Sequence, residues 1–321
     1  MVTLTSILAR LGNALIVMAV VALLTFVLVD VTPGSYLQDL STNPQISTET
    51  IERMRVQFGL DQPFYRKFLR WSASVASGDL GYSFVYQRPV RSLIAERISN
   101  TVLLNVVALT AAWTLGLMLG LAAAASRGSP VDWVISAFTT ILLAAPGVVL
   151  AVLLLAGAAR YGFPIGGLSA ADEAAGTSQR VFDLLRHLTV PATAVALVWL
   201  PAIVRHTRAA LLAALDAPYM LGARSRGIGH WRLLLVHALR EALAPVSTLF
   251  GLSLSAVLSA SLVVEVVMAW PGIGQLAYDA VFKRDIFLVV DLAQLSAIVL
   301  LVGNTVADAF LRRLDPRVAD A

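Results

Sequence analysis

The residues of this sequence that could carry out chemistry are few. Cysteine is absent, which excludes disulfides and thiolate metal sites. A serine nucleophile is suggested at Ser253, in the stretch Gly251-Leu252-Ser253, but it would need a basic side chain within hydrogen-bond reach. All four histidines lie outside the long apolar runs: His187, His206, His230 and His237. No H-E-x-x-H motif is present, and His237 lacks ligand partners at suitable spacing for a metal site. We therefore expect neither an enzyme nor a metal site.

An energy source is also missing from the chain itself. No G-x-x-x-x-G-K-[ST] motif is present, so the sequence predicts no ATP hydrolysis by this chain alone. An ion-coupled secondary transporter would need ionisable residues at membrane depth, and Asp30, Asp291 and Asp308 are the candidates. An interfacial position accounts for each of them more simply. Six spans without an obvious inverted repeat also fit that class poorly, but it stays open as an alternative.

The elements that position these residues are predicted by long uncharged runs. Of the 321 residues, 58% are hydrophobic and 14% charged, against about half and a quarter in a soluble domain. A bilayer core of about 30 Å needs roughly 20 apolar residues of helix. Six runs meet that need: Leu11 to Val29, Thr101 to Ala125, Val134 to Ala159, Leu188 to Val204, Ala242 to Val264 and Ile286 to Ala307. We expect an all-α membrane protein of about six transmembrane helices.

Three of these spans carry more detailed expectations. The first run is longer than the apolar part of an ordinary signal peptide, so we expect a permanent helix. In the fourth, Pro191 and Pro201 are predicted to break the helix. In the sixth, Asp291 should face protein or the headgroup region, because a bare carboxylate in lipid is costly.

Arginine placement predicts the orientation. The net charge is +4. Arg10 precedes the first span and Arg127 lies between the second and third, and several arginines occur between the fourth and fifth spans and after the sixth. Because cytoplasmic loops hold an excess of basic residues, both termini should be cytoplasmic, in the cell membrane. The chain then divides into a first span (1–32), an external loop (33–100), a core (101–310) with a cytoplasmic loop at 213–241, and a tail (311–321). We expect no nucleic acid partner, only the lipid bilayer and other subunits.

The external loop is expected to be structured. Ser47 can cap a helix that stops at Gly59. Phe64, Phe68 and Trp71 then follow at helical spacing. This aromatic stripe suits either contact with the membrane surface or another subunit, or a small packed cap, and the sequence favours neither. A further helix over 90–98 should lead into the second span.

A basic run rich in small residues fills the cytoplasmic loop. Because small side chains allow close backbone approach, a short helix here suits insertion into a groove on a partner, although a solvated connection has the same composition. The run is Leu221, Gly222, Ala223, Arg224, Ser225, Arg226, Gly227, Ile228, Gly229, His230 and Trp231.

Four stretches occur in order at suitable positions between the expected spans. They are Phe58 to Pro63 with Gly78 to Ser83 and Arg88 to Val90; His187 to Ala192 with Arg205 and Arg208; Tyr219 to Pro245; and Glu265 with Ala269 to Gly274 and Arg284-Asp285. Together they resemble the membrane subunits of binding-protein-dependent ABC importers, and more narrowly the first permease of the dipeptide, oligopeptide and nickel class. Leu221 stands where the family's cytoplasmic "EAA" loop has its glutamate, and Pro33-Gly34-Ser35-Tyr36 departs from its Pro-Gly-Asp-Pro.

The resemblance implies a type I ABC importer permease fold and a set of partners. These would be a second, similar permease in a heterodimer, two cytoplasmic ATPase subunits that use ATP and magnesium, and an extracytoplasmic substrate-binding protein. The coupling helix at Leu221 to Trp231 would dock on an ATPase subunit, and this chain would bind no cofactor. Peptides are the leading substrate class, and nickel or another small solute remains open.

Other residues in these stretches have two interpretations each. Arg205 and Arg208 either support the coupling loop or only anchor the chain on the cytoplasmic side, and His237 could cap a helix end there. A second group either forms an outer gate or docking surface, or is only the turn that ends the fifth span: Glu265, Trp270, Pro271 and Gly272.

Overall fold

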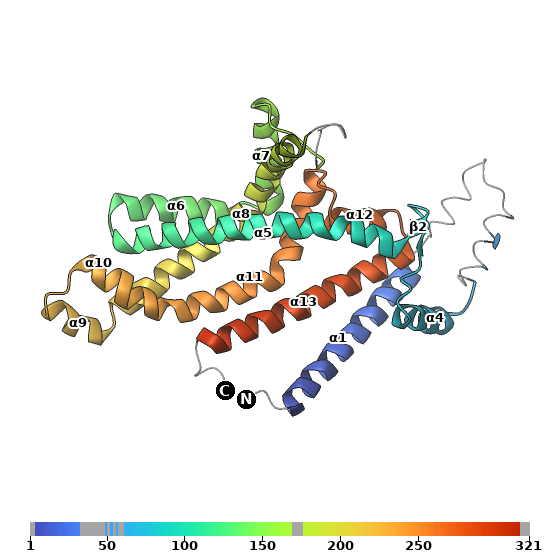
Figure 1. Ribbon diagram of the computed structural model, residues 1–321, viewed down its shortest axis with the longest axis horizontal. Helices are drawn as coiled ribbons and strands as arrows, with labels where there is room; N and C mark the ends of the chain where they lie inside the picture. The colour runs from blue at the N-terminus through green and yellow to red at the C-terminus, as the bar shows by residue number, and fades with distance from the viewer. Residues whose placement is uncertain are drawn as a thin grey trace. The chain divides into compact units, whose positions relative to one another are not determined.

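The computed structural model describes residues 4–32, 49, 52–53, 56, 61–168 and 176–314. Apart from one two-stranded hairpin, the regular structure in these ranges is helical (Figure 1). The helix expected between Ser47 and Gly59 falls mostly outside the described residues. The chain forms two compact units, which are taken separately below: unit 1 is Met1–Ser99 with Gln275–Leu301, and unit 2 is Asn100–Gly274 with Val302–Ala321.

Unit 1 contains the first expected span, part of the sixth, and the segment that follows the first span. Its elements are α1 (Leu4–Val31), α4 (Phe64–Ala76), β1 (Tyr82–Ser83), β2 (Arg88–Pro89), the start of α5 (Val90–Ala125), most of α12 (Ile273–Phe282) and the first part of α13 (Ile286–Leu314). The strands are antiparallel, with Tyr82 opposite Pro89. Helices α1 and α13 lie side by side, since Gln294 donates a hydrogen bond to the carbonyl of Met18 (3.1 Å).

The aromatic stripe of α4 forms a packed cap within unit 1. The ring of Phe26 on α1 lies 6.1, 5.7 and 5.6 Å from the rings of Phe64, Phe68 and Trp71. The indole Nε1 of Trp71 donates to Asp291 on α13 (3.1 Å). Of the two interpretations that the sequence left open, the structure therefore favours the cap. It also confirms that Asp291 faces protein.

Unit 2 is a helical bundle around one long central helix. It contains most of α5, then α6 (Pro130–Ala144), α7 (Gly147–Arg160), α8 (Thr177–Leu215), α9 (Pro218–Ser225), α10 (His230–Arg232), a π-helical segment η1 (Leu233–Ala238) and α11 (Leu239–Val267). Helix α8 packs against α6, α7 and α11. Two thirds of its most apolar window (67%) is buried, more than in any other candidate span of the described residues.

The expected break in the fourth span is wrong, because α8 runs through both Pro191 and Pro201. Its 39 residues correspond to about 58 Å, so its ends extend beyond a bilayer core of about 30 Å. Proline is tolerated in spanning helices where neighbours pack around the kink and satisfy the freed backbone groups. Both prolines are buried.

The third expected span is bent. Helices α6 and α7 meet at an angle of 105°. Ala145 is extended there (ψ 124°), and Pro146 precedes the first residue of α7. A proline disfavours the helical conformation of the residue before it, which accounts for the break. Counting this bent pair as one span, the described residues contain up to six candidate spans, in agreement with the sequence.

Helices α5 and α8 cross at very short range because of two glycines four residues apart. A Cβ added at Gly116 would lie 2.8 Å from the Cβ of Ile203, and one added at Gly120 would lie 2.7 Å from the Cβ of Thr207. Small residues at this spacing let helix backbones approach closely in membranes. The crossing holds α5 against the helix that leads to the cytoplasmic loop predicted from the sequence.

Candidate functional site

The predicted coupling segment, Leu221–Trp231, is called the docking loop below. It consists of the last part of α9, a tight turn, and the start of α10. The turn ends α9 in a Schellman motif: Gly227 N donates to the carbonyl of Arg224 (2.9 Å), and Ile228 N donates to that of Ala223 (3.4 Å). Gly227 has φ +78°, a conformation in which a side chain is strained. The glycine therefore sets the shape of the loop.

One side of the docking loop, together with Met220 just before it, packs against the ends of three helices, with Ala223 and Ile228 partly buried. Met220, Ala223 and Ile228 pack with Leu211 and Leu215 of α8, in a cluster that also includes residues of α5, η1 and α11. Met220 is 1% exposed. This cluster makes the loop a continuation of the bundle, so a force on the loop would reach α8 directly.

The opposite face of the docking loop is open and mixes apolar and basic side chains. Leu221 and Trp231 are 64% and 63% exposed, and Arg224 and Arg226 are exposed as well. A Cβ added at Gly222 or Gly229 would meet nothing within 4 Å. Packing within this chain therefore does not account for glycine at those two positions. A partner that approaches closely would account for it.

The segment after the docking loop is not a regular α-helix throughout. Residues 233–238 form a π-helix, in which Leu233, Leu234 and Ala238 are buried. π-Helical turns inside helices are often found at functional sites. His237 lies in the interior of this segment with an exposed side chain, so it does not cap a helix end.

Arg208 is held away from the docking loop by an ion pair with α6. Its guanidinium donates to both carboxylate oxygens of Asp132, at 2.7 and 2.8 Å. Asp132 is 5% exposed and also accepts a hydrogen bond from Gly128 N (2.9 Å). Arg205, one turn earlier on α8, is exposed. Arg208 therefore joins α8 to the start of α6, which sequence reasoning had not foreseen.

A second ion pair lies where α8 ends and the segment leading to the docking loop begins. Arg127, in the turn between α5 and α6, places its Nη1 2.9 Å from each carboxylate oxygen of Asp216. Asp216 is the C-cap residue of α8.

Of the Asp132–Arg208 pair, only Asp132 has a sequence signal, because Ser129-Pro130 is a helix start with Asp132 in the first turn. Its distant arginine partner has none.

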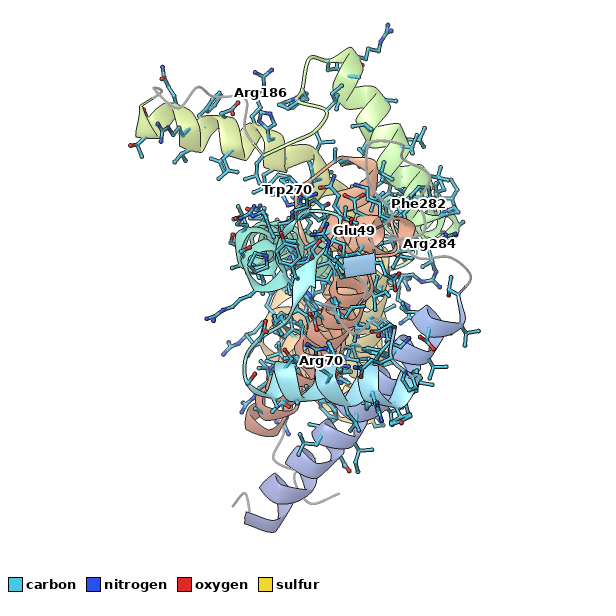
Figure 2. The ribbon with its side chains drawn as sticks, turned by 90° about the vertical axis from the view of Figure 1, so that its right-hand side faces the viewer. Glu49, Arg70, Arg186, Trp270, Phe282 and Arg284 are labelled. Atoms are coloured by element: carbon cyan, nitrogen blue, oxygen red, sulfur yellow. The ribbon has the colours of Figure 1, made fainter. Side chains whose placement is uncertain are left out.

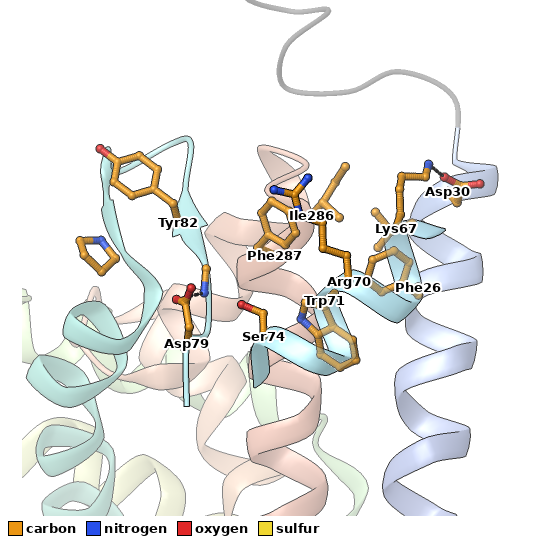
Figure 3. Close-up of a pocket in the computed structure, with 13 residues that line it drawn as sticks. Phe26, Asp30, Lys67, Arg70, Trp71, Ser74, Asp79, Tyr82, Ile286 and Phe287 are labelled. Carbon is orange, nitrogen blue, oxygen red and sulfur yellow. Dashed lines mark hydrogen bonds and ion pairs between the residues drawn. The ribbon is translucent and has the colours of Figure 1, made fainter. Parts of the chain in front are cut away.

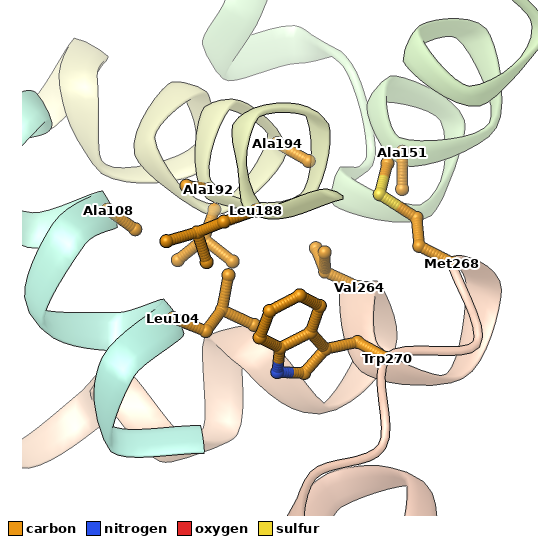
Figure 4. Close-up of a cluster of buried hydrophobic side chains, with 10 residues drawn as sticks. Leu104, Ala108, Ala151, Leu188, Ala192, Ala194, Val264, Met268 and Trp270 are labelled. Atoms are coloured by element: carbon orange, nitrogen blue, oxygen red, sulfur yellow. The ribbon is translucent and has the colours of Figure 1, made fainter. Parts of the chain in front are cut away.

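The residues considered for an outer gate lie in the last turn of α11 and in the tight turn that follows it. Trp270 and Glu265 are fully buried. Glu265 Oε2 accepts from Gly274 N (2.6 Å), and Trp270 Nε1 donates to the carbonyl of Asn100 (3.1 Å). The ring of Trp270 packs in the hydrophobic cluster drawn in Figure 4, and its position is labelled in Figure 2.

The tightness of this turn explains its glycine. A Cβ added at Gly272 would lie 2.3 Å from Glu265 Oε2 and 2.4 Å from the hydroxyl of Thr101. The side chain of Asn100 meanwhile donates to the carbonyl of Pro271 (2.8 Å). Glu265 Oε2, the Trp270 indole and the Pro271 carbonyl are thus engaged within the turn, which favours the structural interpretation of these residues.

Two of the sequence stretches that carry the family resemblance meet in unit 1. Ser83 donates its hydroxyl hydrogen to Asp285 Oδ2 (2.6 Å), and Val85 N donates to the same oxygen (3.1 Å). Burial raises the pKa of the Asp285 carboxyl, and these hydrogen bonds oppose that shift. Nearby, burial and the hydrogen bond to Asp279 raise the pKa of Tyr86 to about 12.

Ser253 has a structural role in place of a nucleophilic one. Its hydroxyl donates to the carbonyl of Phe250 (2.7 Å) and accepts a hydrogen bond from Trp113 Nε1 (3.1 Å). In the described part of the chain, no group of three or more histidine, aspartate or glutamate residues has metal-binding geometry.

Comparison with known proteins decides the class. Residues 116–320 match the family described as the binding-protein-dependent transport system inner membrane component, and residues 3–105 match the N-terminal model of the same system. The chain belongs to this family. It is a multi-pass membrane permease subunit of an ABC importer, a transport component and not an enzyme. The expected fold is confirmed, and the enzyme and ion-coupled alternatives are set aside.

Several curated permeases are similar to this one along nearly their whole length. The oligopeptide transport system permease protein AppB of Bacillus subtilis is 34% identical over 93% of this chain and 94% of its own. The di/tripeptide transport system permease protein DppB of Pseudomonas aeruginosa is 31% identical over 96% of this chain and 97% of its own. A putative peptide transport system permease protein of Brucella suis is 33% identical over 97% and 98%.

A solved structure shares the fold. The MetNI methionine ABC transporter, in an inward-facing conformation, has a chain that superposes with a TM-score of 0.54 at 18% identity. The superposition covers 70% of the present permease and 97% of that chain.

Proposed function

We propose that this permease forms half of the translocation pathway of an ATP-driven importer of di- or oligopeptides, and that its docking loop transmits force from an ATPase subunit. The observation that carries the proposal is the two-faced docking loop. One face is packed on α8, and the other presents Leu221 and Trp231 beside two arginines. Exposed aromatic and aliphatic side chains rimmed by arginine are characteristic of protein–protein interfaces.

The partners follow from this arrangement and from the family. A second, similar permease would complete the pathway, and two ATPase subunits would bind and hydrolyse ATP with magnesium. An extracytoplasmic binding protein would deliver the substrate. Closure of the ATPases on ATP would shift the permeases between two rigid-body states, since ATP binds one state better.

The proposed orientation places the docking loop and both chain termini in the cytoplasm. The arginines of the docking loop and of the α5–α6 turn would then lie on the side where basic residues accumulate. The α4 cap and the hairpin of unit 1 would lie on the opposite, external side. Residues 101–310 would form the permease core and 213–241 its cytoplasmic loop.

The peptide class is taken from the relatives, which are named for oligopeptide or for di- and tripeptide transport. The test is uptake by the complete importer reconstituted in vesicles, supplied with its binding protein and ATP. Labelled di-, tri- and oligopeptides should enter, and nickel should not. Uptake of nickel without peptide uptake would overturn the substrate class, and uptake driven by an ion gradient without ATP would overturn the mechanism.

A further inference from the structure

Unit 1 contains a cavity of about 440 Å³ that the proposed transport role does not use. Its walls come from the end of α1, from α4, from the hairpin and from the start of α13 (Figure 3). This volume falls in the range of small-molecule sites. Phe26, Trp71 and Phe287 supply an aromatic wall.

Charged side chains surround this aromatic wall, and they differ in the ion pairs and hydrogen bonds that they form. Lys67 forms an ion pair with Asp30. Asp79 accepts one hydrogen bond, from Gly81 N (2.9 Å) to its Oδ1. Within the described ranges, the guanidinium of Arg70 makes no hydrogen bond or ion pair, although it lines the cavity. Among the described residues the cavity thus presents the cation of Arg70 and the acid of Asp79 on exposed side chains, a pattern that fits a ligand with both charges.

A second, more apolar groove adjoins the cavity. Its volume is about 270 Å³, and Val29 and Ile286 line both spaces. Leu28 of α1 and Val289 of α13 extend it between the two helices. Both helices are candidate membrane spans, and Leu24 and Leu28 on α1 are 56% and 67% exposed. The charged cavity therefore continues into a surface that suits an acyl chain.

We propose that this cavity binds the headgroup of a zwitterionic membrane phospholipid. The phosphate would accept hydrogen bonds from Arg70, the ammonium would lie at Asp79, and one acyl chain would follow the groove between α1 and α13. Basic and aromatic side chains at the end of a span are typical of the headgroup level of a membrane. A soluble zwitterion, such as a short peptide, would leave the apolar groove unused.

Lipid binding at this site requires only that unit 1 is inserted in the membrane. Its test is therefore independent of the proposed substrate. The direct test is native mass spectrometry of the purified importer complex, titrated with phosphatidylethanolamine or phosphatidylglycerol. Arg70→Gln should weaken phosphatidylethanolamine binding about tenfold, as expected for loss of a hydrogen bond to a charged group. The matched control is Arg66→Gln, because Arg66 lies on the same helix against the Tyr65 ring and does not line the cavity.

A second variant and a competition series complete the test. Ser74→Trp should fill the cavity and displace the lipid even if Arg70→Gln alters the fold of α4. Glycerophosphoethanolamine, inorganic phosphate and trialanine should fail to displace it at equal concentration, because they lack the acyl chain. Equal binding by the Arg70 and Arg66 variants, tighter binding of phosphatidylglycerol, or displacement by any of the soluble compounds would overturn the proposal.

Discussion

The guanidinium of Arg208 donates two hydrogen bonds to the buried carboxylate of Asp132, at 2.7 and 2.8 Å. This pair joins α8, the helix that leads to the docking loop, to the first turn of α6. The exposed pair of Arg127 and Asp216 joins the turn between α5 and α6 to the C-terminal end of α8. The docking loop is thus attached to the bundle through α8 itself, through its apolar cluster and through these ion pairs.

Arg208→Gln should destabilise the permease, since it leaves the carboxylate of Asp132 buried without its cation. Breaking a partly buried pair of this geometry costs about 2 kcal/mol or more. Arg205→Gln is the control, because Arg205 lies one turn away on α8 and is exposed. Thermal unfolding of the purified complex in detergent measures the difference. Equal midpoints for the two variants would show that the Asp132 pair does not stabilise the protein.

Gly222→Trp should abolish uptake and uncouple the ATPase while leaving the permease folded and inserted. A side chain at Gly222 meets nothing within 4 Å in this chain, so the steric block acts on the partner. This position is a sharper probe than Gly227, whose φ of +78° would strain any substituent. Uptake and ATPase rate in vesicles are the measurements.

The control for this variant is Gly12→Trp on α1, where an added Cβ is equally unobstructed. That variant should transport normally. Normal uptake by the Gly222→Trp importer would contradict close docking at α9. A large drop in the thermal midpoint would indicate instead that the substitution had damaged the permease itself.

Tyr86 provides a test of unit 1 at alkaline pH. Its folded pKa of about 12 lies above the ordinary value of 10. The folded state therefore holds the phenolic proton more tightly than the unfolded state. The stability that this contributes is present below about pH 10 and is lost as pH rises towards 12.

A near-ultraviolet titration of phenolate absorbance checks this expectation. Tyr86→Phe should remove the last phenol to ionise, and it should flatten the fall of stability between pH 10 and 12. Tyr161→Phe is the control, since Tyr161 is 78% exposed. If both variants titrate alike at high pH, the hydrogen bond from Tyr86 to Asp279 does not hold in solution.

Parts of this architecture could be predicted because they depend on length and composition alone. Six apolar runs of sufficient length indicated the spans, and small residues among arginines marked the docking loop. The effect of proline was not predictable from the sequence. Pro191 and Pro201 were expected to break a helix but lie inside α8, whereas Pro146 lies at the bend of the third span. The difference depends on packing around each proline, which a single sequence does not record.

Long-range pairs were beyond sequence reasoning for a similar reason. Asp132 and Arg208 are 76 residues apart, and Trp71 and Asp291 are 220 apart. No periodicity connects such positions. The resemblance did name Ser83 and Asp285 in two separate stretches, and the structure places their side chains 2.6 Å apart.

The most direct measurement is site-specific cross-linking from the docking loop in the assembled importer. The chain has no cysteine, so Leu221→Cys or Trp231→Cys introduces a single reactive site in this subunit. A photoactivatable cross-linker at either position should join the permease to an ATPase subunit, and a reagent confined to the inner side of vesicles should label both. Tyr161→Cys, at an exposed position directly after α7 and outside the docking loop, should give no ATPase product. Labelling of Leu221→Cys and Trp231→Cys only from outside, with no ATPase product, would contradict the account.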